Sequence, residues 1–268
     1  MNFKTYLKDL QLTNEDVKRD LTWLGCFVLN KKKHEVENTE LLNGDIKKLN
    51  KGLAKLKKGV PLAHIIKTAP FYGLDFFVNK NVLIPRMETE ILVEKVINDY
   101  KQQKQLEILD LCTGSGCIAI TLKKSLDCNV LAVDVSKKAL KIAQKNAKLH
   151  STAINFIKSN MFDGINKKFD IIVSNPPYIS HNEIEKLPLS VKNFDPRIAL
   201  DGGNDGLDFY RIIANQAASF LKGNGTLYLE IGFDQGESVP KLLEENFKNV
   251  EVFKDFDNNN RIIKCLRR

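Results

Sequence analysis

From residue 86 onward, short apolar runs alternate with longer stretches in which apolar residues recur every three or four positions. The short runs have the length and the β-branched content of buried strands. They span residues 107–111, 130–133, 154–157, 171–173 and 226–231. The helical stretches between them span residues 118–126, 137–149 and 209–220. This alternation predicts βαβ units, and therefore an α/β fold with a Rossmann-like, mostly parallel sheet covered by helices on both faces.

The two ends of the chain follow other patterns. Residues 250–253 and 261–266 flank a polar stretch, which predicts an antiparallel strand pair at the edge of the sheet. Near the start, residues 13–16 offer an N-cap and early acidic residues for a helix whose apolar positions continue to Val28. A second helix is predicted from about Glu40 through Leu56 to the Gly and Pro at residues 59–61. The first part of the chain is therefore predicted to be a small helical bundle.

Between these parts lies an aromatic and β-branched stretch that predicts a strand pair, with its turn at residues 79–81. We therefore expect a helical domain over residues 1–69, a hairpin linker over 70–85 and a sheet domain over 86–268.

Charge and cysteine content limit the class of protein. Of the net charge of +8, most lies at the front, where residues 1–70 contain 14 Lys and Arg and 8 Asp and Glu. Such a region suits RNA, a ribonucleoprotein or an acidic protein surface, although a solvated lysine-rich surface fits equally well. The five cysteines form no Cys-x-x-Cys pair, so no disulfide framework and no metal site are predicted. No apolar run is long enough for a membrane span and the first six residues lack signal-peptide features, so we expect a cytoplasmic protein.

A glycine-rich turn follows the first predicted strand of the sheet. It contains Cys112, Thr113, Gly114, Ser115 and Gly116. Glycine allows a tight turn and the close approach of a ligand, and the following helix offers free N–H groups, although an ordinary βα turn has the same form.

Two further positions fit a nucleoside ligand. Asp134 ends the next strand, where a carboxylate suits ribose hydroxyls or a helix cap. After the third strand, Asn160 can read an adenine edge, while Met161 and Phe162 either cover the adenine face or pack in the core. Because neither a phosphate-binding loop nor a three-glycine fingerprint is present, the pattern favours a nucleoside without pyrophosphate, such as S-adenosylmethionine.

The tetrapeptide Asn175, Pro176, Pro177 and Tyr178 follows the fourth predicted strand. Ligands of open α/β sheets bind at the carboxyl ends of strands, so this tetrapeptide is expected to face the cofactor. The prolines stiffen the loop. The Asn175 amide oxygen and the Pro176 carbonyl can accept both hydrogens of an NH2 group, and Tyr178 can lie against its flat face.

Such an arrangement suits methylation of a planar nitrogen. An amide nitrogen is a poor nucleophile because its lone pair is delocalised. Two acceptors on its hydrogens raise its electron density and orient it toward the methyl donor, and positioning can supply much of the remaining catalysis. No strong base is required, and the four histidines form no cluster in the sequence.

Two longer segments extend this picture. Residues 82–90 read Val-Leu-Ile-Pro-Arg-Met-Glu-Thr-Glu, and residues 195–207 read Asp-Pro-Arg-Ile-Ala-Leu-Asp-Gly-Gly-Asn-Asp-Gly-Leu. With the tetrapeptide and the Leu-Glu-Ile-Gly stretch at 229–232, they resemble the HemK-type peptide-chain-release-factor glutamine N5-methyltransferases over nearly the whole chain. The resemblance implies a seven-stranded methyltransferase domain behind an N-terminal substrate-recognition domain. It also implies S-adenosylmethionine as cofactor and the glutamine of the Gly-Gly-Gln loop of release factors as substrate.

Matched position by position, the resemblance assigns cofactor contacts to residues 112–116, Asp134, Asn160, Met161 and Asn175, and the glutamine to residues 175–178. Three departures from the family pattern concern the site or its connector. Cys112 stands where the family usually has Gly, Asn160 replaces a frequent Asp, and Met87 replaces a usual Pro. In addition, residues 63–67 lack the family's Tyr-Ile-x-Gly pattern.

Other functions remain open at this stage. A ribosomal-protein glutamine is a related substrate, and adenine or guanine in nucleic acid would also offer a planar nitrogen to the tetrapeptide. The long segments and the lack of a recognisable RNA-binding module favour a protein substrate, with no stable nucleic-acid binding and no membrane partner. A non-catalytic binding protein fits least well, because every cofactor position is occupied.

Overall fold

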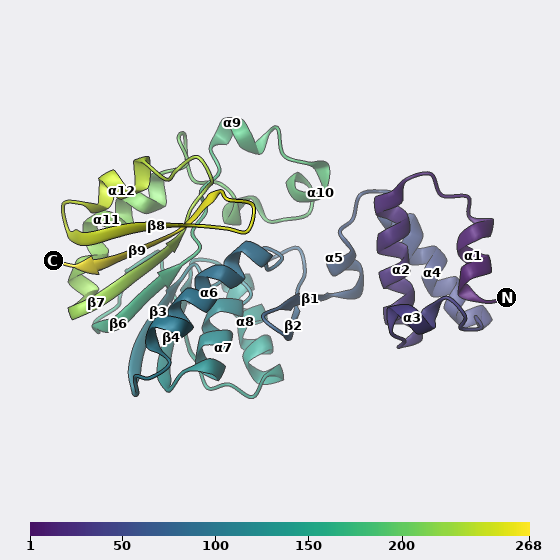
Figure 1. Ribbon diagram of the computed structural model, residues 1–268, viewed down its shortest axis with the longest axis horizontal. Helices are drawn as coiled ribbons and strands as arrows, with labels where there is room; N and C mark the ends of the chain where they lie inside the picture. The colour runs from purple at the N-terminus through teal and green to yellow at the C-terminus, as the bar shows by residue number, and fades with distance from the viewer. The chain divides into compact units, whose positions relative to one another are not determined.

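The computed structural model describes residues 1–268 and groups them into two units (Figure 1). One unit contains Met1–Thr68 together with Leu189–Phe194, and the other contains Ala69–Pro188 and Asp195–Arg268. None of the helices is both long and apolar enough to cross a membrane.

The N-terminal unit is helical. Its helices within the first 68 residues are α1 (Phe3–Asp9), α2 (Glu15–Leu29), α3 (Lys33–Val36), α4 (Asn43–Leu56) and α5 (Leu62–Ile66). Asn14, within the predicted N-cap residues 13–16, caps α2, and its side chain accepts a hydrogen bond of 3.0 Å from the Val17 amide. Glycines let the helices pack closely, since a Cβ on Gly25 would lie 2.4 Å from the Phe3 ring. The buried side chains of α1, α2 and α4 form one core.

A two-stranded hairpin, β1 (Thr68–Phe71) and β2 (Leu74–Phe77), follows α5. The sequence correctly predicted a strand pair and a turn at residues 79–81, where the Asn81 and Val82 amides donate to Asn79, but this turn follows β2 and does not join the two strands. The hairpin turn lies at Tyr72 and Gly73, which both have positive φ, as a two-residue hairpin turn requires. Phe71 and Phe76 meet edge to face, with ring centroids 6.0 Å apart, inside the core of the sheet-containing unit.

The second unit is built on a seven-stranded sheet with the order β5-β4-β3-β6-β7-β9-β8. The strands are β3 (Leu106–Leu111), β4 (Cys128–Asp134), β5 (Asn155–Lys158), β6 (Phe169–Ser174), β7 (Leu221–Glu230), β8 (Phe247–Lys254) and β9 (Asn260–Arg267). The pairs among β3 to β7 are parallel, while β9 runs antiparallel to both β7 and β8. The predicted α/β class, the mostly parallel sheet and the antiparallel C-terminal pair are confirmed.

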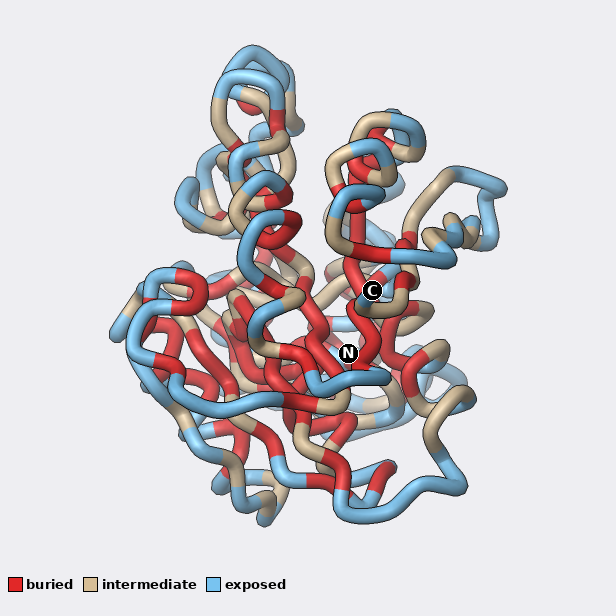
Figure 2. Tube along the Cα trace, turned by 90° about the vertical axis from the view of Figure 1, so that its left-hand side faces the viewer, coloured by how far each residue is buried: buried red, intermediate tan, exposed pale blue.

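Helices cover the sheet and create two separate hydrophobic cores. The main helices are α6 (Met87–Tyr100), α7 (Cys117–Ser125), α8 (Lys137–Leu149), α11 (Asp208–Phe220) and α12 (Ser238–Leu243). Alternate strand residues enter opposite cores, so Ile108 packs with α6 and α7, whereas Leu109 packs with α11 and α12. In Figure 2 the buried segments accordingly lie inside a layer of half-buried and exposed chain.

The remaining short elements are α9 (His181–Ile184), α10 (Leu189–Lys192) and the 3-10 turn η1 (Arg197–Ala199). The strand order reverses at β3, because the chain moves outward from β3 through β4 to β5 and then returns to place β6 on the other side of β3. In open α/β sheets, ligands bind at the carboxyl ends of the strands beside such a reversal.

Candidate active site

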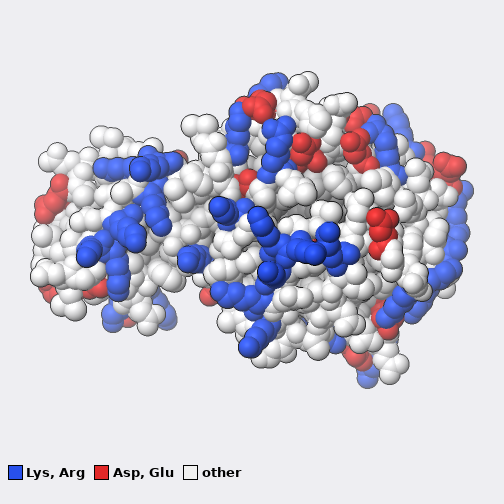
Figure 3. Space-filling view, turned by 180° about the vertical axis from the view of Figure 1, so that it is seen from behind, with Lys and Arg blue, Asp and Glu red and all other residues white.

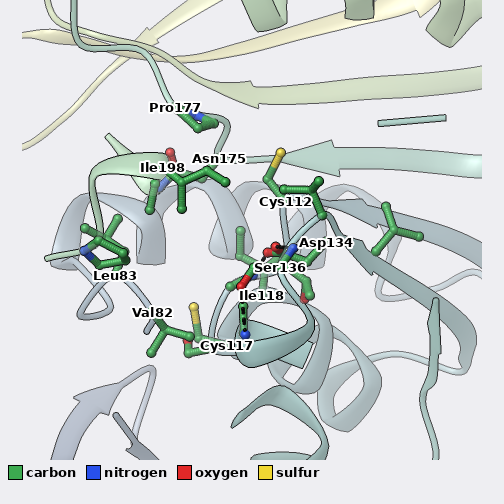
Figure 4. A pocket seen from close by; sticks show the side chains of 18 of the residues that line it. Val82, Leu83, Cys112, Cys117, Ile118, Asp134, Ser136, Asn175, Pro177 and Ile198 are labelled. Carbon is green, nitrogen blue, oxygen red and sulfur yellow. Dashed lines mark hydrogen bonds between the residues drawn. The ribbon is translucent and has the colours of Figure 1, made fainter. Parts of the chain in front are cut away.

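A pocket lies beyond the carboxyl ends of β3, β4 and β6 (Figure 4). Nine of the predicted site residues line it, namely Cys112, Thr113, Gly114, Ser115, Asp134, Asn160, Met161, Asn175 and Pro177. Three others, Gly116, Pro176 and Tyr178, lie in the same loops but do not line the pocket. The fold therefore gathers segments that are widely separated in the sequence around one cavity.

The glycine-rich turn between β3 and α7 forms one wall of the pocket. Cys112 and Gly114 both adopt left-handed backbone conformations, with φ of 59° and 54°. Gly116 also has positive φ, and a Cβ there would lie 3.1 Å from the Ala143 side chain, so its role is to let α7 pack against α8. The fully buried Asn146 of α8 ties this turn to the hairpin, since its Nδ2 donates to the carbonyls of both Ser115 and Phe77.

Asp134 ends β4 and faces the pocket (Figure 4). Its Oδ2 accepts a hydrogen bond of 2.9 Å from the Gly114 amide, and its Oδ1 accepts one of 2.8 Å from the Ser136 amide. Burial raises the pKa of this carboxyl, while the two backbone hydrogen bonds act in the opposite direction. Since a carboxylate has about four acceptor positions, Asp134 braces the glycine-rich turn and can still accept from a pair of ligand hydroxyls.

The segment after β5 contributes Asn160, which is exposed, and Met161, which is buried. The Met161 sulfur lies 3.8 Å from the Cys112 Sγ, so the segments that follow β3 and β5 contact each other at the pocket. Phe162 does not cover a ligand, because it stacks on Phe220 inside the core, with ring centroids 4.8 Å apart. Of the two interpretations of this residue, core packing is correct.

Asn175 follows β6 and is half-buried at the pocket wall. Its Nδ2 donates a hydrogen bond of 3.1 Å to the hydroxyl of Thr89 in the first turn of α6. Pro176 and Pro177 are buried. Tyr178 is half-buried, and burial raises the pKa of its phenol well above the ordinary value, so this group remains neutral at physiological pH.

The segment 195–207 packs directly on this tetrapeptide. A Cβ on Gly206 would lie 2.4 Å from the Tyr178 carbonyl oxygen, and a Cβ on Gly202 would lie 2.8 Å from the Tyr178 Cα. Both positions therefore need glycine because the two backbones approach so closely. The Tyr178 carbonyl also accepts a hydrogen bond of 3.1 Å from Gln235.

Several polar residues at the site were not assigned a role from the sequence. Thr89 and Glu230 are buried and hydrogen-bonded to each other, and Arg86 pairs with Asp195 at 2.7 Å. All four lie in the segments that carry the family resemblance, and this was the feature of the sequence that could have identified them. Their interactions join α6 to β7 and to the loop after α10, which are contacts between distant parts of the chain.

The electrostatics of the pocket suit ligand positioning better than acid–base chemistry. Arg86 and Asp134 are the only charged side chains among the residues that line it, and no histidine does so. Burial raises the pKa of the Cys112 thiol, which therefore stays protonated and is a poor nucleophile. The pocket can hold a nucleoside beside an amide acceptor, and it offers no strong base.

Comparison with known proteins agrees with this geometry. Residues 87–190 match the family model of the methyltransferase small domain. The chain is 46% identical over 220 residues to the release factor glutamine methyltransferase of Flavobacterium psychrophilum, an alignment that covers 79% of this chain and 77% of the relative. It is 37% identical over 278 residues to the protein of the same name from Clostridium acetobutylicum, covering 99% and 93% of the two chains.

Among solved structures, the fold resembles that of the E. cuniculi Mtq2–Trm112 complex, responsible for the methylation of the eRF1 translation termination factor. The TM-score is 0.52 and the sequence identity 21%, with 70% of this chain and 99% of the other chain covered. This likeness concerns the fold, which is that of a methyltransferase. The sequence identities to the bacterial relatives go further, and the chain belongs to the release factor glutamine methyltransferase family.

Proposed function

We propose that this protein transfers a methyl group from S-adenosylmethionine to the side-chain amide nitrogen, N5, of the glutamine in the Gly-Gly-Gln loop of peptide chain release factors. Membership of the family supports the reaction and the substrate class. The observation that carries the proposal at the level of the site is the position of Asn175, whose amide lies at the wall of the same pocket as Asp134 and the glycine-rich turn.

The residues around the pocket fit the cofactor. Asp134 has acceptor positions left for two ribose hydroxyls, and the exposed Asn160 can accept from an adenine amino group. Ile118, Val135 and Met161 offer apolar surface for the adenine ring. Bound there, S-adenosylmethionine would supply an electrophilic methyl group on a sulfonium sulfur.

We assign the substrate amide to Asn175 and its neighbours. The Asn175 amide oxygen and the Pro176 carbonyl would accept the two hydrogens of the glutamine NH2, which orients its nitrogen and raises its electron density. Pro177 stiffens the loop, and the Tyr178 ring would lie beside the flat amide. The proton lost after methylation is acidic, so a pocket without a strong base suffices.

Methyl transfer to purified substrates tests this function. The full-length protein would be incubated with S-adenosylmethionine carrying a labelled methyl group and with a release factor, a ribosomal-protein fraction or RNA. Label is expected in the release factor, and a release factor whose loop glutamine is replaced by alanine is expected to remain unlabelled. Label in RNA or in a ribosomal protein, with none in the release factor, would overturn the proposal.

The N-terminal unit is the proposed substrate-recognition domain. On the face of this unit seen in Figure 3, Lys and Arg side chains predominate over Asp and Glu. Trp23 and Phe27, one turn apart on α2, are exposed, and the Lys33 ammonium lies 5.6 Å from the Trp23 ring centroid. Exposed aromatic side chains are enriched at protein-binding surfaces, and the surrounding positive charge would attract an acidic partner.

Charge reversal tests this role. Replacing Lys31, Lys32 and Lys33 by Glu is expected to lower kcat/KM for the intact release factor at least about tenfold. Methylation of a short Gly-Gly-Gln peptide should be unchanged. The control reverses two exposed lysines of the other unit, Lys101 and Lys104. Equal turnover of the release factor by all three proteins would mean that the basic surface is merely solvated.

A further inference from the structure

The amide of Asn175 has two chemically different ends, and only one of them suits the proposed reaction. The oxygen can accept a hydrogen bond from the substrate NH2, whereas the nitrogen is a donor and would repel it. An asparagine that rotates freely by 180° about its last bond would present the wrong end part of the time. Something must therefore hold the Asn175 amide in one orientation.

The contact that distinguishes the two ends is made by Thr89. The Asn175 Nδ2 donates to the Thr89 Oγ1 at 3.1 Å, which turns the nitrogen toward α6. Thr89 is only 3% exposed, so water does not compete freely for this hydroxyl. A hydroxyl can donate as well as accept, however, and alone it would tolerate either end of an amide.

Glu230, the last residue of β7, removes this ambiguity. It is 1% exposed, and its Oε2 accepts a hydrogen bond of 2.7 Å from the Thr89 Oγ1. An ionised carboxylate only accepts, so the Thr89 hydrogen must point at Glu230. The Thr89 oxygen can then only accept a hydrogen bond from Asn175, so the Asn175 NH2 group must be the donor.

We propose that Thr89 and Glu230 are positioning residues that lock the Asn175 amide with its oxygen toward the nitrogen that receives the methyl group. The hydrogen bonds run in one direction, from Asn175 through Thr89 to Glu230, across the start of α6 and the ends of β6 and β7. This inference rests on the proposed function, because it concerns the acceptor for the substrate amide.

A purely structural role makes a different prediction. If Thr89 and Glu230 only fasten α6 to β7, losing their hydrogen bond would lower stability and leave the chemical step intact. If they orient Asn175, losing it would lower kcat in a folded protein, and the effect would disappear once the Asn175 amide is absent. The two roles are therefore separable by kinetics.

The first experiment removes the Thr89 hydroxyl while conserving its volume. Thr89→Val is expected to lower kcat about 10- to 100-fold while the Kd for S-adenosylmethionine changes less than about threefold. Thr89→Ser, which keeps the hydroxyl, should restore most of the rate. The matched control is Thr121→Val, because Thr121 is also buried in this unit and its hydroxyl has no hydrogen-bond partner. This control should behave as wild type.

The second experiment combines Thr89→Val with Asn175→Ala. If Thr89 acts through Asn175, the double variant should have the same residual kcat as Asn175→Ala alone. Glu230→Gln, which can donate as well as accept, should lower kcat in the same way as Thr89→Val. Two outcomes would overturn this inference and leave the proposed function standing. In the first, the wild type is active and Thr89→Val is equally active. In the second, the losses of the two single variants add up in the double variant. A wild type that methylates no release factor would instead refute the proposed function.

Discussion

At position 112 the backbone conformation, more than the side chain, sets the requirement. Cys112 has φ of 59°, a region that non-glycine residues enter at a cost of about 1 kcal/mol or more. This explains why the family usually has Gly here. The small thiol side chain is compatible with the turn and lies 3.8 Å from the Met161 sulfur.

Two substitutions at Cys112 should therefore have opposite outcomes. Cys112→Gly is expected to keep S-adenosylmethionine binding within about threefold of wild type, since glycine adopts this φ freely. Cys112→Val should lower the free energy of unfolding by about 1–3 kcal/mol and weaken cofactor binding, because a β-branched residue is strained at positive φ. Denaturant unfolding and calorimetric titration would measure both effects. Equal tolerance of Gly and Val would show that the turn is not strained.

The two pocket asparagines are expected to act at different stages. Asn175→Ala should lower kcat at least about 100-fold while the Kd for S-adenosylmethionine changes less than about threefold, since the lost acceptor acts on the substrate amide. Asn160→Ala should instead weaken cofactor binding by about 1 kcal/mol, because it removes one hydrogen bond to adenine. Titration with the cofactor and single-turnover kinetics separate these effects. Parallel losses in both variants would mean that Asn175 is mainly a cofactor ligand.

At the scale of elements, one ion pair joins the two segments that carry the family resemblance. Arg86 precedes α6, and Asp195 begins the loop that packs on residues 175–178. The Asp195 side chain is 1% exposed and Arg86 is 38% exposed. Burial raises the pKa of Asp195, whereas Arg86 favours its ionised form. The pair fixes the loop against the start of α6.

Arg86→Ala should leave the Asp195 carboxylate buried without its cation. We expect it to lower the free energy of unfolding by about 1–3 kcal/mol. This loss is smaller than the one that follows when a fully buried ion pair is broken, because water reaches Arg86. The control is Arg197→Ala in the same segment, whose own side chain is exposed in both of its ion pairs, so that these pairs should contribute less than about 1 kcal/mol. Urea unfolding measures the difference. Similar effects of both changes would mean that the buried pair does not hold the loop.

At the scale of the whole molecule, two carboxyl groups lie in the fully buried interior of the sheet domain. Burial raises the pKa of Glu230 and that of Asp110 to about 7. Around Glu230, hydrogen bonds from Thr89 and Tyr178 and the charge of Arg261 favour the ionised form, while Glu88 opposes it. Around Asp110, the Thr113 hydroxyl favours ionisation and Asp134 opposes it.

These groups should give stability and activity opposite trends with pH. A carboxyl whose pKa is raised by folding binds its proton more tightly in the folded state, so its stabilising contribution is present below the unfolded pKa and is lost as pH rises through about 7. Activity should rise over the same interval, because Glu230 must be ionised to orient Thr89. Melting curves and kcat between pH 5 and pH 8 test this.

The Glu230→Gln variant serves as the control for that experiment. Its melting temperature relative to wild type should increase as pH rises from about 5 to 8, because it lacks one of the two titrating groups. Its low kcat should lose the rise near neutral pH. A wild-type kcat that falls with increasing pH across this interval would contradict the proposed need for an ionised Glu230.

The sequence alone determined the alternating pattern and therefore the parallel sheet, the helices α7, α8 and α11, and the loops that reach the pocket. These features depend on local periodicity and on glycine or proline at turns, which are properties of neighbouring residues. It also determined nine of the residues that line the pocket, because the carboxyl ends of parallel strands meet at one edge. The hairpin turn was misplaced because Asn79 and Asn81 are as typical of turns as Gly73.

Only the tertiary structure decided which residues surround Asn175. Thr89 lies 86 positions before Asn175, and Glu230 lies 141 positions after Thr89, so no local pattern links them. The same holds for the pair of Arg86 with Asp195 and for the burial of Phe162 against Phe220. A hydrogen bond between distant segments depends on how the helices and the sheet pack, and that packing fixes which end of the Asn175 amide faces the pocket.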